Sequence, residues 1–219
     1  MARRKPAPDL FDPPPDARIA GIDEAGRGPL AGPVVAAAVI IDAAKIPEGV
    51  TDSKLIAEPI REALYEAIIA AAEAFGVGEA SVKEIDRINI HHATLLAMRR
   101  AFAALAARAG HAAEFVYVDG IHLPRIKCMA RAIVDGDALI PQVSAASIIA
   151  KVTRDRIMRA LDTKFPGYGW ASNKGYSTRE HLLALQGLGA TRHHRRSFEP
   201  VRIVLSGGAI EGLVAAAAE

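Results

Sequence analysis

The segment that most constrains the fold is residues 17–41, in which two apolar runs flank a turn rich in charge and glycine. The first run, Ile19–Ile22, leads directly into Asp23 and Glu24, and the second run covers Val34–Ile41. Two short apolar runs separated by a glycine-containing turn predict two β-strands. The chain therefore places two acidic side chains where a buried strand meets a loop.

Carboxylates at such a position are costly because neighbouring negative charges repel and burial disfavours the ionised form. A bound divalent cation would remove that cost, and oxygen ligands favour Mg²⁺ or Mn²⁺ over Zn²⁺. Successive strand residues face opposite sides, so Asp23 and Glu24 share a site only if the strand ends or bulges there, or if Glu24 contributes through its main chain or a water. The alternative is an exposed acidic pair at an ordinary hairpin.

The composition fits one large domain, or one domain with an appendage. The chain has 219 residues, of which 51% are hydrophobic, and this is enough to bury a substantial core. No uninterrupted apolar segment reaches membrane-spanning length. Cys128 is the single cysteine, which excludes an internal disulfide and fits a reducing cytoplasm. Residues 1–16 begin with the basic run Arg3-Arg4-Lys5 and are proline-rich, and we expect them to form a flexible tail.

Helical and strand patterns alternate through the middle of the chain. Apolar spacing predicts a helix over 59–75, a short strand over 76–82, a turn or short helix over 81–86 and a helix over 91–108. Further helices are expected over 142–165, over 178–186 and in the Ala-rich stretch near the C-terminus. This alternation is typical of an α/β fold.

Two more apolar runs end in aspartate with glycine beside it. Phe115–Val118 precedes Asp119, and Ala132–Val134 precedes Asp135 and Asp137. The carboxyl ends of neighbouring strands in an α/β sheet converge on one region, so these side chains can meet in space. Cations held by such acids can activate water and stabilise a leaving oxygen in phosphoryl transfer.

The C-terminal third is basic. Residues 151–202 contain eleven Lys or Arg against four Asp or Glu. This asymmetry favours a polyanionic partner, although a solvated basic helix would give the same count. Together with the acidic residues near the Gly-Arg-Gly turn, this basic region predicts a nuclease that acts on a nucleic acid backbone.

Several ordered motifs resemble bacterial type 2 ribonuclease H. The motifs are Gly21–Pro33, Asp52-Ser53-Lys54, Tyr117-Val118-Asp119-Gly120, Gly136-Asp137, Ser144–Asp155, Pro166–Gly169, Lys174-Gly175-Tyr176 and His194–Phe198. The resemblance extends from about residue 19 to residue 201, and its first motif is the most specific. It implies a ribonuclease H-like fold, in which a central mixed β-sheet is flanked by helices, with a catalytic core over 17–165 and a small helical C-terminal extension over 166–219 that contributes to substrate binding.

The resemblance also implies residue roles. The acidic metal-binding and catalytic set would be Asp23, Glu24, Asp119 and Asp137. Gly26, Arg27 and Gly28 would recognise the ribonucleotide 2′-hydroxyl and the adjoining phosphate, and Tyr176 would stack on the following sugar. Such recognition distinguishes RNA from DNA without identifying a base. The candidate phosphate contacts are Lys54, Lys151, Lys174, Arg195 and Arg196, any of which could instead be a solvated charge.

The chain departs from the family pattern in two places. Asp135 stands where the family commonly has a basic residue, so it competes with Asp137 as a ligand, and the spacing from Asp119 and the following Gly136 favour Asp137. The segment Leu55-Ile-Ala-Glu-Pro59 replaces the usual Lys and Ser or Thr cap after Lys54. The start of the next helix is therefore not fixed by the motif.

Together these features predict a Mg²⁺- or Mn²⁺-dependent endoribonuclease. We expect it to cut the RNA strand of RNA–DNA hybrids. The resemblance implies that it also acts on ribonucleotides embedded in duplex DNA, with cleavage on the 5′ side of the ribonucleotide to leave a 3′-hydroxyl and a 5′-phosphate. We expect a cytoplasmic monomer with no membrane partner that removes misincorporated ribonucleotides. The alternatives are a non-cleaving nucleic-acid-binding module and a metal nuclease selective for DNA junctions.

Overall fold

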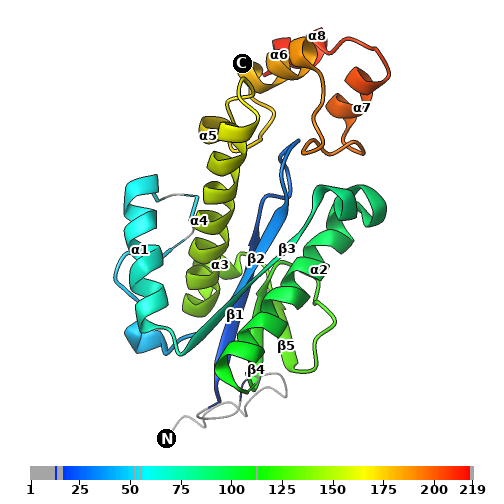
Figure 1. Ribbon diagram of the computed structural model, residues 1–219. Coiled ribbons are helices and arrows are strands. Elements are labelled where there is room, and N and C mark those ends of the chain that lie inside the picture. Colours follow the sequence, from blue (N-terminus) through cyan, green and yellow to red (C-terminus); the bar gives the residue numbers. More distant parts are fainter. Residues whose placement is uncertain (1–12, 14–16, 52, 55, 112, 218–219) are drawn as a thin grey trace, which may run out of the picture.

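The computed structural model describes residues 13, 17–51, 53–54, 56–111 and 113–217. The expected tail over 1–16 therefore lies outside the described residues except for Pro13, and so do Asp52 of the second motif and Leu55, which follows that motif. Figure 1 shows a central sheet between helices, with a smaller helical part beyond the end of α4. The predicted α/β architecture with a C-terminal helical extension is confirmed.

Within these ranges, five strands form one mixed sheet. They are β1 (Ile19–Ala25), β2 (Val34–Ile40), β3 (Ala74–Ala80), β4 (Phe115–Asp119) and β5 (Met129–Ile133). Their order across the sheet is β3-β2-β1-β4-β5. β1, β2 and β3 pair antiparallel, whereas β4 lies parallel to both β1 and β5. The chain thus brings β4 next to β1, the strand that carries the first acidic pair.

Helices cover both faces of the sheet (Figure 1). α2 (Val82–Ala109) packs on one face, and α1 (Glu58–Ala71) and α4 (Pro141–Lys164) pack on the other. β2 is buried along its whole length, because its even-numbered residues from Val34 to Ile40 face α2 while Ala37 and Val39 face α4. A continuous apolar run is typical of a strand buried on both sides.

A glycine sets the distance between β1 and α4. A Cβ atom added at Gly21 would lie 2.1 Å from the main-chain carbon of Gln142, which is closer than any real contact. Glycine is therefore required here for the first turn of α4 to pack on β1. This close packing places Ser147, farther along α4, beside Asp23.

α2 consists of two helical parts, so the expected short helix followed by a separate helix is confirmed. The two parts are separated by Asn89, whose φ of 64° and ψ of 167° are not helical. Its side chain accepts a hydrogen bond from the His92 amide at 3.1 Å, so Asn89 caps the second part. The first part begins with Ser81 as its cap, which forms a capping box with Glu84.

Replacing Asn89 by Ala is expected to destabilise the protein by about 2 kcal/mol, because it removes the cap and leaves a Cβ-bearing residue without side-chain compensation at positive φ. Asn89→Gly loses the same cap but adopts positive φ without strain, so it should cost less than Asn89→Ala. Urea denaturation of both variants measures the difference. Equal losses would show that the backbone conformation contributes nothing.

The other elements shift the predicted boundaries by a few residues. α1 ends at Ala71 instead of residue 75, because β3 already begins at Ala74. The C-terminal part contains α5 (Trp170–Asn173), α6 (Arg179–Leu188), α7 (Glu199–Leu205) and α8 (Glu211–Ala216). The remaining short helices are η1 (Ala43–Lys45) and α3 (Gly136–Leu139). Among the described residues, no helix has the length and apolar character needed to cross a bilayer.

Candidate active site

Three carboxylates meet where β4 ends beside β1. The parallel register pairs Ile22 with Val118, so the next residues along the two strands, Asp23 and Asp119, lie side by side. Asp23, Glu24 and Asp119 each offer an oxygen within 4.8 Å of the others. β4 ends at Asp119, so the Glu24 carboxylate can reach this group although successive strand residues face opposite sides.

The carboxylates of Asp23, Glu24 and Asp119 repel one another, and burial largely keeps Asp23 and Glu24 from contact with water. Burial raises the pKa of Asp23 well above its usual value, and the charges of Glu24 and Asp119 raise it further. Burial also raises the pKa of Glu24, although Arg27 opposes this shift from 3.4 Å. A hard divalent cation fits this donor set, because three carboxylates supply oxygen ligands and their repulsion would be neutralised by its charge.

Asp137 lies near this group but outside it. It belongs to α3, not to a strand end, and only 8% of its surface is exposed. Its carboxylate lies 3.6 Å from the Lys54 ammonium. The Gly136 amide donates to the Asp119 carboxylate at 2.8 Å, so α3 is attached directly to the acidic site. Asp135 is exposed with a φ of 54°, and it borders a neighbouring cavity that also touches Asp119.

The Gly26-Arg27-Gly28 turn forms one wall of the site. Gly26 is buried and has a φ of 94°, whereas Arg27 and Gly28 are exposed. Tyr176 stands across from this turn with 44% of its surface exposed, and a Cβ atom at Gly28 would lie 3.6 Å from its ring. The structure therefore brings together the turn and the tyrosine, which are about 150 residues apart in the sequence.

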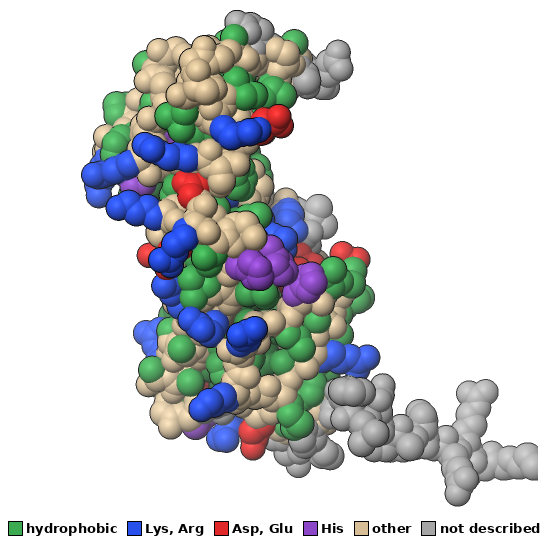
Figure 2. Space-filling view, turned by 90° about the vertical axis from the view of Figure 1, so that its right-hand side faces the viewer, with side chains coloured by type: hydrophobic (Ala, Val, Ile, Leu, Met, Phe, Trp, Pro, Cys, Tyr) green, Lys and Arg blue, Asp and Glu red, His purple; other side chains and the backbone are tan. Residues whose placement is uncertain are grey.

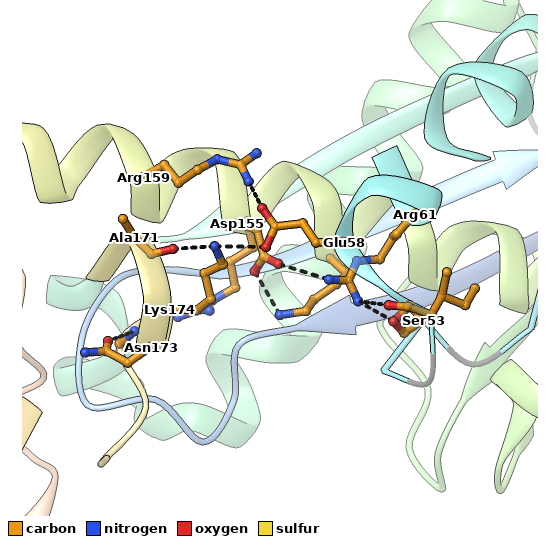
Figure 3. A network of polar contacts seen from close by, with 12 residues as sticks. Ser53, Glu58, Arg61, Asp155, Arg159, Ala171, Asn173 and Lys174 are labelled. Carbon is orange, nitrogen blue, oxygen red and sulfur yellow. Dashed lines mark hydrogen bonds and ion pairs between the residues drawn. The ribbon is translucent and has the colours of Figure 1, made fainter. Parts of the chain in front are cut away.

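Ser53 and Lys54 are held on another wall by buried polar contacts. The Ser53 hydroxyl shares a 2.7 Å hydrogen bond with Ser147, and Arg61 donates to the main-chain oxygen of Ser53 at 2.5 Å (Figure 3). Arg61 also donates to the Ile56 carbonyl. These contacts connect the segment to both α1 and α4. α1 begins without a side-chain cap, and an arginine from its first turn holds the preceding segment in place.

Lys151 and Lys174 are occupied by protein partners in this structure. Lys151 donates to Asp155 at 2.8 Å, and burial lowers its pKa despite this bond. Lys174 is 8% exposed and donates to the Ala171 carbonyl at 2.5 Å, with Glu58 at 3.2 Å (Figure 3). Lys151 still borders the cavity, whereas Lys174 connects the C-terminal part to α1.

The two neighbouring arginines differ in placement. Arg196 is exposed, as a phosphate contact requires. The side chain of Arg195 is completely buried and donates to main-chain oxygens beneath the turn, so it presents no group to a phosphate in this structure. The prediction of a direct Arg195 phosphate contact thus finds no support in its position.

Two buried histidines support the loop that carries Tyr176. The Thr191 amide donates to Nδ1 of His194, so Nε2 of His194 carries the proton and points at Nε2 of His181 at 3.2 Å. Trp170 donates to the same His181 nitrogen at 3.0 Å. His181 Nδ1 is therefore the protonated nitrogen and donates to the Tyr176 carbonyl at 2.7 Å. Both rings must be neutral for this arrangement to hold.

Acid should weaken this arrangement. Burial lowers the pKa of His194 to about 3, and His181 and His193 add to the shift. An unfolded histidine has a pKa near 6.5, so the unfolded state binds more protons as pH falls below that value, and stability is lost from pH 6.5 toward pH 3. The expected loss between pH 7 and pH 5 is about 2 kcal/mol.

Urea denaturation at pH 7 and pH 5 measures this loss in the wild type and in His194→Asn. The Asn oxygen can keep the hydrogen bond from the Thr191 amide, but the side chain does not titrate. The variant should therefore show a pH-dependent loss smaller than that of the wild type by about 2 kcal/mol. Identical losses in the two proteins would contradict the role of His194.

These walls enclose a cavity of about 540 Å³. Its lining includes the three carboxylates, the Gly26-Arg27-Gly28 turn, Lys54, Lys151 and Tyr176. The cavity combines an acidic end with a basic rim, which suits a metal and a phosphodiester together. A larger cavity of about 670 Å³ between β3, α2 and α4 is lined mainly by apolar atoms and contains none of the acidic residues predicted to bind metal.

Sequence reasoning missed the side chains that support the site from below. Arg61, His181 and His194 are 7%, 0% and 1% exposed, yet each has the residue type of a surface position. Arg154, on α4, is also buried, and it donates to the Ala31 and Pro33 carbonyls. A basic residue in an amphipathic helix gives no sequence signal that its partners are distant main-chain oxygens.

Comparisons with known proteins agree with this geometry. The family model for ribonuclease HII matches residues 20–201. A ribonuclease HII of Ralstonia pickettii is 52% identical over 216 residues, covering 94% of this chain and 93% of the relative.

Two solved structures have the same fold. The ribonuclease H2 of Pyrococcus horikoshii superposes with a TM-score of 0.70 at 31% identity, covering 86% of this chain and 97% of that one. The ribonuclease HII of Archaeoglobus fulgidus, solved in complex with PCNA, has a TM-score of 0.68 at 29% identity, with coverages of 83% and 95%. The chain therefore belongs to the ribonuclease HII family and is an endoribonuclease of the ribonuclease H type 2 class.

Proposed function

We propose that the site hydrolyses a phosphodiester bond on the 5′ side of a ribonucleotide, using divalent cations held by Asp23, Glu24 and Asp119. The observation that carries this proposal is the convergence of these three carboxylates within 4.8 Å. Mg²⁺ or Mn²⁺ would supply an activated water and stabilise the leaving oxygen, which gives 3′-hydroxyl and 5′-phosphate products. Asp137 would complete the ligand set from α3, beside Lys54.

The wall of the cavity that is formed by the Gly26-Arg27-Gly28 turn and Tyr176 would recognise the ribose. The exposed main chain of Arg27 and Gly28 can approach a sugar closely and donate to its 2′-oxygen and to the adjoining phosphate. Tyr176 lies across from the turn, where its exposed ring can stack on the following sugar. Deoxyribose lacks the 2′-oxygen, so an all-DNA duplex would lose the hydrogen bond to that oxygen.

Phosphates along the duplex would be held by basic side chains around this cavity. Lys54 is 75% exposed, and Lys151 and the exposed Arg196 are the other candidates. Figure 2 shows Lys and Arg side chains along most of the length of one face, from the C-terminal helices to the lower part of the sheet domain. Such contacts add affinity without sequence preference and weaken with salt.

The remaining parts of the proposal concern cellular context. RNA–DNA hybrids and duplex DNA with single embedded ribonucleotides are the substrates, and removal of misincorporated ribonucleotides is the role. The protein acts as a cytoplasmic monomer, with residues 17–165 as the catalytic core and 166–219 as an extension that contacts the substrate. The free Cys128 thiol, whose pKa burial raises, fits a reducing compartment.

Cleavage of an end-labelled duplex containing one ribonucleotide tests the proposal. The full-length protein is incubated with Mg²⁺, Mn²⁺ or chelator, beside an all-DNA duplex of the same sequence. We expect a metal-dependent cut on the 5′ side of the ribonucleotide and none in the all-DNA duplex. Equal cutting of both duplexes would retain the acidic site but refute ribose recognition by the turn and Tyr176.

A further inference from the structure

Arg195 is a completely buried cation that donates to four main-chain oxygens of one loop. Its Nη2 donates to the carbonyls of Gly26 at 2.5 Å and Pro33 at 3.3 Å, its Nη1 to that of Arg27 at 2.7 Å, and its Nε to that of Gly32 at 3.0 Å. Burying an arginine is costly unless its donors are satisfied, and here the loop satisfies them.

These contacts and the geometry of the peptide bond together determine the direction in which the Arg27 and Gly28 amides point. The structure contains no cis peptide among its described residues, and in a planar trans peptide the C=O and N–H bonds point in opposite directions. The Gly26 carbonyl shares its peptide with the Arg27 amide, and the Arg27 carbonyl shares its peptide with the Gly28 amide. Since both carbonyls point inward at Arg195, both N–H groups point away from it.

We infer that Arg195 is the positioning residue that aims the Arg27 and Gly28 amides at the ribose and its adjoining phosphate. This inference rests on the proposed function of the turn. The guanidinium fork holds the two consecutive carbonyls at once, so neither peptide can rotate to turn its oxygen toward the substrate. An oxygen so turned would repel the phosphate instead of donating to it.

The charge of Arg195 strengthens the same donors. A carbonyl that accepts a charge-assisted hydrogen bond is polarised, and its peptide N–H becomes a better donor. Burial lowers the pKa of Arg195 to about 9, and the nearby Arg154 adds to the shift, but the group remains charged at neutral pH. Lysine would keep a charge but could not hold both carbonyls with the same planar geometry.

Arg154 does not duplicate this role. Its hydrogen bonds go to Ala31 and Pro33, at the far end of the loop. The main chain of the C-terminal segment supports that same end, because the Arg195 amide donates to Leu30 at 2.8 Å. The Arg195 side chain, in contrast, donates to the carbonyls of Gly26 and Arg27.

The test compares Arg195→Lys with the wild type and with Arg100→Lys. Arg100 is a matched control because it also donates to a main-chain carbonyl, that of Glu79, but it lies on α2 outside the candidate site. The kcat/KM for a duplex with one ribonucleotide is measured together with inhibition by the identical all-DNA duplex. Each assay is run well below the melting temperature of the variant.

We expect Arg195→Lys to lower kcat/KM about 100-fold, the typical cost of misplacing one aimed backbone donor. Its inhibition constant for the all-DNA duplex should change by a much smaller factor, because that duplex lacks the 2′-oxygen and the phosphate contacts made by other residues are untouched. Arg100→Lys should change neither quantity. A fall of kcat/KM by less than threefold, or an equal weakening of all-DNA binding, would overturn the inference.

Chemical rescue provides a second readout. In Arg195→Ala, millimolar guanidinium ion should restore kcat/KM at least tenfold by occupying the vacated site, whereas ethylammonium, which has the charge without the fork, should not. Rescue by both ions alike would contradict the positioning role.

If the wild type itself does not prefer the ribonucleotide duplex, the proposed function fails. If it does and both variants retain that preference, only the role of Arg195 fails.

Discussion

Replacing Asp23 by Asn is expected to lower kcat at least about 10³-fold and, in chelator, to raise the melting temperature. Activity falls because Asn is a poorer ligand for a hard cation at the centre of the acidic group. Stability rises because the buried carboxylate is repelled by Glu24 and Asp119, and a neutral amide is not. A gain of 1 kcal/mol would shift the melting temperature by about 3 °C in a chain of this size.

Thermal melting with and without Mg²⁺ or Mn²⁺ measures the second effect independently of activity. The wild type should gain stability on addition of metal, and Asp23→Asn should gain much less. Asp135→Asn is the matched control: it makes the same chemical change at an exposed acid, and Asn tolerates its φ of 54°. This control should keep activity within about threefold. Full activity in Asp23→Asn would refute the proposed metal site.

Gly26→Ala should have the second largest effect. A Cβ atom there would lie 1.9 Å from Nε of Arg154, and alanine would also have to adopt a φ of 94°. Arg154 cannot yield easily, because it is buried and donates to two carbonyls of the same loop. We expect a loss of about 3 kcal/mol from strain and overpacking, and a fall in kcat/KM because the turn moves.

Gly28→Ala is the control, because it adds the same methyl group to the same turn without strain or overpacking. At Gly28 a Cβ atom would make an ordinary 3.6 Å contact with the Tyr176 ring, and φ does not lie in the left-handed region. Its free energy of unfolding, measured in urea, should therefore stay within about 0.5 kcal/mol of the wild type. If Gly26→Ala is as stable as Gly28→Ala, the packing of Arg154 against the turn does not contribute to the free energy of unfolding.

Much of the fold could be predicted because each element has a local signal. Ile19–Ala25, Val34–Ile40 and Phe115–Asp119 are dense apolar runs, and their strand assignment was correct within a few residues. The signal failed where a boundary depended on tertiary contacts. The helix predicted over 59–75 ends at Ala71, because Ala74 already pairs with Ile40 in the sheet.

The residues of the acidic site could be predicted where they lie at the ends of strands. Asp23 and Asp119 follow from adjacent strands, whereas Asp137 lies on α3 beside Lys54, and its role as a ligand stays a prediction. The basic residues could not be sorted from sequence, because charge alone does not reveal burial. Arg195 and Arg196 are neighbours in the chain, yet one lies under the turn and the other in solvent.

The support of the Gly26-Arg27-Gly28 turn by Arg195 bears on the order in which the enzyme matures during translation. The ribosome produces the turn among the first 30 residues, but its buried arginine follows almost 170 residues later. N-terminal segments fold first as they emerge, so the sheet can form around an unsupported loop. A nascent chain would thus acquire Asp23, Glu24 and Asp119 before its competence to recognise ribose, which waits until Arg195 has been synthesised and packed under the turn.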